Sequence, residues 1–259
     1  MSKNQLVEMK GIKKRFGEVK ALKGVDFEVG ENEIVGLVGD NGAGKTTLIK
    51  ILTGIYKPDA GQIYYRGEER SFSSPRESRN WGIETIHQEM ALIDDMTIKE
   101  NFFLGKTPTR KIAGVNFLDE DRMEKICREA LEEVGIEFGS LDKTVAPLSG
   151  GERKAIAIAR SMYFGKNLAV MDEPTAALSL EETQRVLDYI KSIKKENMSG
   201  ILISHLTRHV YPAADRFVIL DSGRKTGDFT KGDISREELE KLIVSGRMSE
   251  TGQKTDNTS

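Results

Sequence analysis

Gly39-Asp40-Asn41-Gly42-Ala43-Gly44-Lys45-Thr46 is the stretch that decides the fold, because it fits the phosphate-cradling pattern G-x-x-x-x-G-K-[ST]. An apolar run at residues 34–38 leads directly into it, and residues 46–52 beyond it have helix-forming character. A strand, a glycine-rich loop and a helix in this order are the context that such a loop requires. The sequence therefore predicts a phosphate-binding loop at residues 39–46.

Two further motifs follow in the second half of the chain, Leu148-Ser149-Gly150-Gly151-Glu152 and Met171-Asp172-Glu173-Pro174. The loop pattern alone would occur by chance in roughly one or two per cent of chains this long and this rich in glycine, so the weight rests on the ordered set. Together, the three motifs predict a nucleotide hydrolase.

The distribution of apolar runs predicts an α/β protein with a parallel core sheet. Buried strands that alternate with helical patterns are typical of such a sheet, and here the runs lie at residues 34–38, 83–86, 168–171, 200–203 and 216–220. Shorter runs with turn signals between them predict a small antiparallel β subdomain, at residues 6–9, 25–29 and 62–65. Between residues 90 and 165 helical periodicity dominates, which predicts a helical insertion between two core strands.

Local signals place several helix boundaries. A helix over residues 119–134 should end at Gly135, and the capping boxes Ser74-Pro75-Arg76-Glu77 and Ser235-Arg236-Glu237-Glu238 should each start one. Residues 248–259 are polar and without periodicity, so we expect them to be disordered. The chain has no internal repeat, which excludes a duplicated ATPase.

Composition excludes several classes of protein. The net charge is −2 with no segregated block of either sign, which argues against a nucleic-acid partner. The single cysteine, Cys127, excludes an internal disulfide framework and lies on an apolar helical stripe, where packing is its expected role. No run approaches the ~18 apolar residues of a membrane span, and the first residues lack a signal-peptide core, so we expect a cytoplasmic protein.

The residue types in the loop suit a triphosphate. Gly39, Gly42 and Gly44 allow the backbone to turn its N–H groups inward, and the following helix directs its positive end at the same anion. Lys45 would neutralise the β and γ phosphates, and the Thr46 hydroxyl is placed to coordinate Mg²⁺.

The other two motifs also carry chemistry at predictable places. Asp172 and Glu173 follow a buried strand, where Asp172 would bind the Mg²⁺ shell and Glu173 would orient or deprotonate the attacking water; the alternative is a solvated strand end. Ser149 and the glycine N–H groups after it offer a second anion site at a helix N-terminus, although Ser-Gly-Gly alone is more often a turn.

In order and spacing, these motifs together with Gln88 and Ile203-Ser204-His205 resemble the ATP-binding cassette (ABC) ATPases over residues 5–245. The loop sequence, residues 82–89, residues 101–105 and Pro174-Thr175-Ala176-Ala177-Leu178 look like the monosaccharide importers of that family. The resemblance implies a P-loop NTPase with a mixed, mainly parallel core sheet, and a cassette spanning residues 5–246 with the helical subdomain at about 90–165, followed by a tail at 247–259.

The resemblance also implies site roles, with ATP and Mg²⁺ as cofactors. Two copies would face each other head to tail, with each ATP between one chain's loop and the other chain's signature loop, residues 148–152. Catalysis would depend on Glu173, on His205 at the γ-phosphate and on Lys45; Thr46, Gln88 and Asp172 would surround the metal. The nucleotide would contact Phe16 (against adenine), Gly39, Asp40, Asn41, Gly42, Ala43, Gly44, Lys45, Thr46, Thr47, Gln88, Ser149, Gly150, Gly151 and Glu152. By themselves, a lone Phe is more often core and a Gln at a strand end is ordinary surface.

The chain departs from the family pattern in three respects. Glu152 stands where Gln is commonest, which should matter little if Ser149 and the backbone hold the phosphate. Ser179 stands where many relatives have Asp, which puts that contact across the dimer in doubt. The chain has one cassette, whereas most of the monosaccharide group have two fused, so it resembles the short branch closest to the fructose type.

The function that this implies is the ATPase subunit of a sugar importer, peripheral on the inner face of the cell membrane. Its partners would be a second ATPase subunit, a transmembrane permease and, indirectly, a sugar-binding protein. The alternative is a soluble ABC-type switch that acts on ribosomes, DNA or iron–sulfur assembly, but no charged linker or long coiled coil is present.

Overall fold

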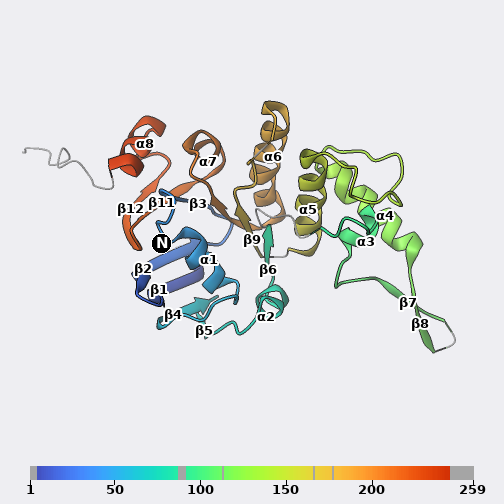
Figure 1. Cartoon of the computed structure of the whole chain (residues 1–259), viewed down its shortest axis with the longest axis horizontal. Coiled ribbons are helices and arrows are strands. Elements are labelled where there is room, and N and C mark those ends of the chain that lie inside the picture. The colour runs from blue at the N-terminus through green and yellow to red at the C-terminus, as the bar shows by residue number, and fades with distance from the viewer. Residues whose placement is uncertain (1–4, 87–91, 113, 166, 177, 246–259) are drawn as a thin grey trace, which may run out of the picture.

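The computed structural model describes residues 5–86, 92–112, 114–165, 167–176 and 178–245, and a six-stranded sheet of order β12-β11-β3-β10-β9-β6 lies at its centre (Figure 1). Five of these strands are parallel and β12 pairs antiparallel with β11. Their bounds are β3 Ile34–Val38, β6 Ile83–Ile86, β9 Leu168–Asp172, β10 Ser199–Ile203, β11 Arg216–Asp221 and β12 Arg224–Thr230. The predicted mixed, mainly parallel core sheet is confirmed.

A second, antiparallel sheet of order β2-β1-β4-β5 lies beside the core sheet, at the lower left of Figure 1. Its strands are β1 Gln5–Phe16, β2 Val19–Gly30, β4 Ala60–Tyr65 and β5 Glu68–Arg70. β1 and β2 extend well beyond the predicted apolar runs. The sequence pattern missed the added residues because many of them are partly exposed and because register shifts interrupt the pairing. The antiparallel β subdomain is therefore as predicted in kind but larger in extent.

Helices pack against the two faces of the core sheet. They are α1 Lys45–Leu52, α2 Pro75–Asn80, α3 Ile98–Phe102, α4 Glu120–Glu133, α5 Gly150–Phe164, α6 Leu180–Ser192, the 3₁₀ turn η1 Ile193–Glu196, α7 Thr207–Ala213 and α8 Arg236–Ser245. α3, α4 and α5 form the helical part at the right of Figure 1. Within the described residues, none of these helices is long and apolar enough to cross a bilayer.

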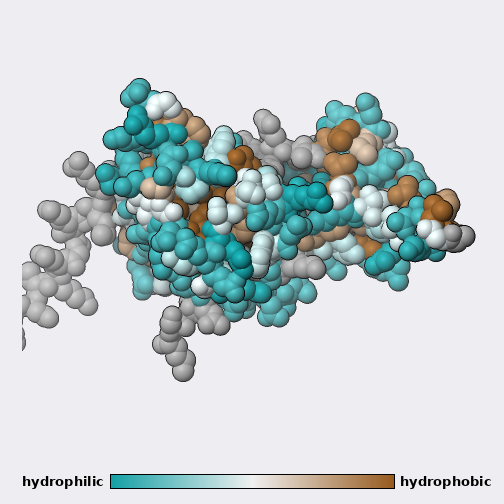
Figure 2. All heavy atoms as spheres, turned by 90° about the horizontal axis from the view of Figure 1, so that it is seen from below, coloured by the Kyte–Doolittle hydropathy of each residue, from teal (hydrophilic) through white to brown (hydrophobic). Residues whose placement is uncertain are grey.

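One element of the helical part was not predicted. A two-stranded ribbon, β7 Thr109–Ile112 with β8 Val115–Leu118, projects from the body between α3 and α4 (Figure 1). Ile112 pairs with Val115 and Arg110 with Phe117, so Ile112, Val115 and Phe117 share one face and are 48%, 56% and 50% exposed. Figure 2 shows hydrophobic residues at this end of the molecule. The predicted insertion is mainly helical but also carries this ribbon, which the sequence did not reveal because an exposed ribbon has no core face to impose a clear alternation.

The core strands contribute side chains to two hydrophobic cores, one on each face of the sheet. Alternate residues of a strand point to opposite faces, and in β3 Ile34 and Val38 pack with the helices while Val35 and Leu37 pack with α1 and the antiparallel sheet. The same division holds along β9, β10 and β11. The sheet is therefore fixed from both sides, which holds the loops at its edge in place.

The helix caps largely follow the sequence. Ser235 and Glu238 form the predicted reciprocal bonds, and Gly135 follows α4 with a φ of 79°. At α2 the prediction was half wrong: Ser74 accepts from the Glu77 N–H, but the Glu77 carboxylate accepts from the N–H and hydroxyl of Ser73 instead. Cys127 is fully buried and burial raises the pKa of its thiol to about 12, in keeping with a packing role.

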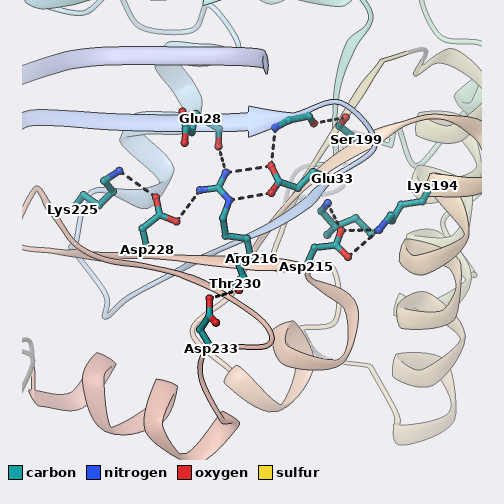
Figure 3. Close-up of polar contacts among 12 residues, drawn as sticks. Glu28, Glu33, Lys194, Ser199, Asp215, Arg216, Lys225, Asp228, Thr230 and Asp233 are labelled. Atoms are coloured by element: carbon teal, nitrogen blue, oxygen red, sulfur yellow. Dashed lines mark hydrogen bonds and ion pairs between the residues drawn. The ribbon is translucent and has the colours of Figure 1, made fainter. Parts of the chain in front are cut away.

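A buried ion-pair network joins the two sheets at the edge opposite the glycine-rich loop (Figure 3). The Arg216 guanidinium on β11 donates to both carboxylate oxygens of Glu33, at 3.0 and 3.2 Å, to Asp228 on β12 and to the carbonyl of Glu28 on β2. Glu33 in turn accepts from the N–H of Gly30 at 2.7 Å. The side chains of Arg216 and Glu33 are 11% and 5% exposed, so their pairing offsets part of the cost of burying the two charges.

Substituting Arg216 by alanine removes the guanidinium that donates to both oxygens of the buried Glu33 carboxylate. We expect Arg216→Ala to lower the free energy of unfolding by about 3–5 kcal/mol, measured by urea denaturation. Lys191→Ala, which removes an exposed ion pair with Asp188, is the control and should cost less than about 1 kcal/mol. An equal loss of unfolding free energy in the two variants would contradict a stabilising role for the ion-pair network.

Candidate active site

The predicted site residues meet at the carboxyl edge of the core sheet. β10 lies between β3 and β9, and Ile203 at its end is in register with Leu37 on one side and Asp172 on the other. The residues that follow these three strands are therefore neighbours: the glycine-rich loop after β3, Glu173 after β9, and His205 after β10. Three motifs far apart in the sequence are brought to one place.

Two of the loop glycines are required by the protein itself, and a third leaves space. A Cβ at Gly39 would lie 2.1 Å from the carbonyl oxygen of Leu220, and one at Gly44 would lie 2.9 Å from that of Ala21. A Cβ at Gly42 would meet no atom within 4 Å, although its φ of 79° is also positive. The space beside Gly42 is therefore available to a ligand.

This space is part of a cavity of about 310 Å³ over the loop. Its walls are made by the loop and the start of α1, by the beginning of β2 and by one residue after β11: Asn41, Gly42, Ala43, Gly44, Lys45, Thr46, Thr47, Val19, Lys20, Ala21, Lys23 and Ser222. No local motif marks the β2 residues, because only the folding of distant segments places them beside the loop.

Lys45 lies at the floor of the loop, 7% exposed. Its Nζ donates to the carbonyl oxygens of Gly39 and Asp40, at 2.7 and 2.9 Å. Burial lowers the pKa of the Lys45 ammonium, while the carboxylates of Glu173 and Asp172 act in the opposite direction. Lys45 is thus a buried cation in the field of two acids at the end of β9, the strand on the far side of β10.

Glu173 is held by three donors from the end of β10. Its Oε1 accepts from the backbone N–H of His205 at 2.9 Å and from the His205 ring Nδ1 at 2.7 Å, and its Oε2 accepts from the hydroxyl of Ser204 at 2.8 Å. Because a carboxylate only accepts, Nδ1 of His205 carries the proton and Nε2 is directed elsewhere. The residue is 9% exposed and has a φ of 49°, an uncommon conformation for a residue other than glycine. The sequence did not predict that Ser204 bonds Glu173. Its place directly before His205, at the end of a core strand, was the one feature that could have suggested it.

The signature loop begins α5 and forms a complete capping box. The Ser149 hydroxyl accepts from the N–H of Glu152 at 3.2 Å, and the Glu152 carboxylate accepts from the N–H of Ser149 at 2.8 Å. Ser149 and Gly150 are exposed, and residues 148–152 are not among those that line the cavity over the glycine-rich loop. Within one chain, therefore, the structure does not bring the signature loop to the phosphate loop.

The remaining predicted residues lie as follows. Asp172 ends β9 and is half-buried. Phe16 ends β1, is 42% exposed and packs edge-on against Tyr56, with 5.2 Å between ring centroids; it does not line the cavity, whereas Val19 does. Gln88 lies outside the described residues, two positions after the end of β6.

Comparison with known proteins identifies the family. The family profile described as ABC transporter matches residues 22–176, more than half of the chain. The chain belongs to the ABC transporter family. Its cassette is an ATPase, so ATP is its nucleotide.

Two relatives have nearly the length of this ABC cassette. The xylose/arabinose import ATP-binding protein XylG of Sulfolobus acidocaldarius is 40% identical over 93% of this chain and 95% of that protein. The fructose import ATP-binding protein FrcA of Rhizobium meliloti is 40% identical over 87% of this chain and 88% of that protein. The ribose import ATP-binding protein RbsA of Caldanaerobacter subterraneus is 37% identical over 95% of this chain but only 49% of its own length, so this chain spans about half of that relative.

Solved structures share the fold. A nucleotide-free ATP-binding cassette from an ABC transporter superposes with a TM-score of 0.78 at 25% identity, covering 93% of this chain and 95% of that one. A dimeric post-hydrolysis state of the cassette MJ0796, bound to ADP and Pi, superposes with a TM-score of 0.74 at 24% identity, covering 87% and 98% of the two chains.

The loop geometry separates a binding defect from a folding defect. We expect Gly42→Ala to cost only the strain of a positive φ, about 1–2 kcal/mol, yet to weaken ATP binding roughly tenfold or more, because the methyl group takes space at the cavity. Gly44→Ala has a positive φ as well and additionally meets Ala21 and Leu22, so its unfolding free energy should fall further. Urea denaturation and titration with a fluorescent ATP analogue measure the two effects. Unimpaired nucleotide binding by Gly42→Ala would contradict the assignment of this space to the phosphates.

Proposed function

We propose that this chain is the subunit that hydrolyses ATP to energise the import of a monosaccharide through a membrane permease. The observation that carries hydrolysis is the Glu173 carboxylate, oriented by Ser204 and His205 beside the phosphate loop. The observation that favours a sugar is the pair of relatives of nearly equal length, which are named for xylose/arabinose and fructose import.

In this proposal the cavity over the loop receives the triphosphate. The backbone N–H groups of residues 39–47 bind its oxygens at the N-terminus of α1, and Lys45 exchanges its two carbonyl acceptors for the β and γ phosphates. A phosphate is a better acceptor than a carbonyl for a buried ammonium, because the hydrogen bond is then assisted by opposite charges.

Glu173 and His205 divide the work at the γ-phosphate. Glu173 orients or deprotonates the attacking water, since its carboxylate is fixed by donors and cannot swing away. His205 has its Nδ1 engaged with Glu173, so its Nε2 side is the one that contacts the γ-phosphate. The pair therefore acts as a unit rather than as two separate residues.

The donors near the loop suit Mg²⁺ rather than a transition metal. Thr46 and Asp172 offer hard oxygen ligands, and the described residues contain no cluster of three or more His, Cys, Asp or Glu side chains that could enclose a metal by themselves. Mg²⁺ needs few protein ligands because phosphate oxygens and water complete its shell; when bound, it neutralises charge on the β and γ phosphates. Gln88 is the third proposed ligand.

Completion of the site requires a second chain in this proposal. Ser149, Gly150, Gly151 and Glu152 are exposed or half-buried at the start of α5, away from their own chain's phosphate loop, and would close over the nucleotide of the partner. Phe16 would stack on adenine. Ser179, which replaces an aspartate common in relatives, caps α6 together with Glu182, so its local role is fulfilled without a contact across the dimer.

The membrane partners follow from the import function. The permease would dock on the ATPase dimer at the inner face of the membrane, and a sugar-binding protein would deliver the cargo. We assign the cassette to residues 5–246, with the helical insertion at about 90–165. Residues 247–259 would be a tail outside the cassette.

Removing the charge of Glu173 tests the hydrolytic assignment. We expect Glu173→Gln to bind Mg-ATP with an affinity within about threefold of wild type but to lose turnover by roughly 100-fold or more, since the water is no longer activated. The matched control is Glu129→Gln, which changes an exposed acid on α4 and should retain most turnover. An active Glu173→Gln variant would remove the proposed role of this residue.

The same variant tests the transport assignment, because it should hold ATP in a closed dimer. The tagged Glu173→Gln chain, expressed in its native cell and crosslinked with Mg-ATP, should co-purify with a multi-spanning permease and a sugar-binding protein, identified by mass spectrometry. Recovery of ribosomal, DNA-repair or cluster-assembly proteins without a permease would overturn sugar import while leaving the ATPase assignment intact.

A further inference from the structure

Lys154, in the second turn of α5, connects the signature helix to the backbone at the proposed catalytic residue. Its Nζ donates to the carbonyl oxygen of Ala176 at 2.5 Å and to that of Glu173 itself at 3.3 Å. The residue is 5% exposed. A lysine at this depth is uncommon, because the burial of an ammonium must be offset by hydrogen bonds and opposite charge.

The segment that Lys154 contacts is the turn after β9. Glu173 has a φ of 49°, and the N–H of Ala176 donates back to the Glu173 carbonyl at 3.1 Å. On the other side of the turn, the Thr175 hydroxyl is hydrogen-bonded to Nδ1 of His209 on α7, at 2.8 Å. Lys154 is thus the contact that ties this strained turn to α5, while His209 ties it to α7.

The other polar contacts of α5 lead elsewhere. The Arg153 guanidinium pairs with Asp94, and Arg160 donates to the carbonyl of Leu104 at 2.9 Å, both within the helical part of the chain. Lys154 alone among these three cations reaches the carboxyl edge of the core sheet. Lys154 therefore offers a direct polar connection through which a shift of α5 can reach the backbone of Glu173.

Electrostatics supports the same connection. Burial lowers the pKa of the Lys154 ammonium, and the Glu173 carboxylate opposes that change. Glu173 therefore helps to keep Lys154 charged, and the charged ammonium is what makes the bonds to the two carbonyls strong.

We propose that Lys154 is a positioning residue that holds the backbone of Glu173 in its own chain. The N-terminus of α5 contacts the ATP bound to the partner chain, and Lys154 on the same helix fixes the glutamate that acts on the ATP bound to its own chain. This inference rests on the proposed nucleotide-sandwich dimer. Each chain then links the two ATP sites through one helix: Ser149 contacts one nucleotide and, in the next turn, Lys154 sets the geometry at the other.

The first test substitutes Lys154 by methionine, which has similar length but neither charge nor donor. We expect the KM for ATP to change by less than about threefold and kcat to fall about 10- to 100-fold, because a small displacement of a reacting group is costly in rate. Lys154→Arg, which keeps the charge and donors, should recover part of kcat. Lys125→Met, an exposed lysine on α4, is the control and should retain wild-type kcat. If the wild type is active and Lys154→Met has the same kcat, the role of Lys154 is contradicted but the proposed function stands. If the wild type itself does not hydrolyse ATP, the proposed function is contradicted.

The second test distinguishes positioning of Glu173 from mere support of the signature loop. Defined heterodimers, isolated through two different tags, carry Lys154→Met and Glu173→Gln either on the same chain or on opposite chains. If Lys154 acts on its own chain's Glu173, the same-chain dimer keeps one intact site and about half of wild-type turnover, and the opposite-chain dimer loses nearly all. The reverse order would show that Lys154 serves only the signature loop, and would overturn the inference. If Lys154→Met fails to fold, Lys154→Gln, which keeps a donor on a shorter side chain, replaces it in both tests. The expected turnover values, and the values that would contradict the inference, stay the same.

Discussion

The position of β10 between β3 and β9 is the constraint on which the site depends. Ile203 is in register with both Leu37 and Asp172, and its carbonyl accepts from the N–H of Glu173, so three chain segments leave the sheet at the same level. A slip of one residue in either pairing would turn alternate side chains to the wrong core, and both faces of this sheet are buried. The two cores therefore enforce the register, and the register sets the distances between the phosphate loop, Glu173 and His205.

The charges at this edge also depend on one another. Lys45 and Lys154 are both buried and both donate to backbone carbonyls, and for each the Glu173 carboxylate opposes the effect of burial on the pKa. Glu173 is thus a shared counter-charge for a lysine of the phosphate loop and a lysine of the signature helix, while Ser204 and His205 satisfy its oxygens. A change at any of these groups alters the environment of the others, which is the physical basis for treating the edge as one unit.

Much of this arrangement could be predicted from local sequence, because the motifs carry their own geometry. The loop glycines, the acids after a buried strand and the capping of α5 by Ser149 are each decided within a few residues. What could not be predicted depends on distant pairing or on exposure. Ser204 and Lys154 matter because of where β10 and α5 lie relative to Glu173, and the ribbon of β7 and β8 has no buried face to reveal it. The Glu77 carboxylate bonds Ser73 rather than Ser74, a choice between adjacent donors that the pattern leaves open.

In the proposed function, a complete ATPase site needs Glu173 of one chain and Ser149 of another. The most direct measurement is turnover per chain at saturating Mg-ATP across a dilution series, with the mass of the ATP-bound species determined by sedimentation at each concentration. The account predicts that turnover rises and saturates in parallel with the fraction of dimer. Undiminished turnover by a species that sediments as a monomer would contradict it, because a single chain would then contain the whole site.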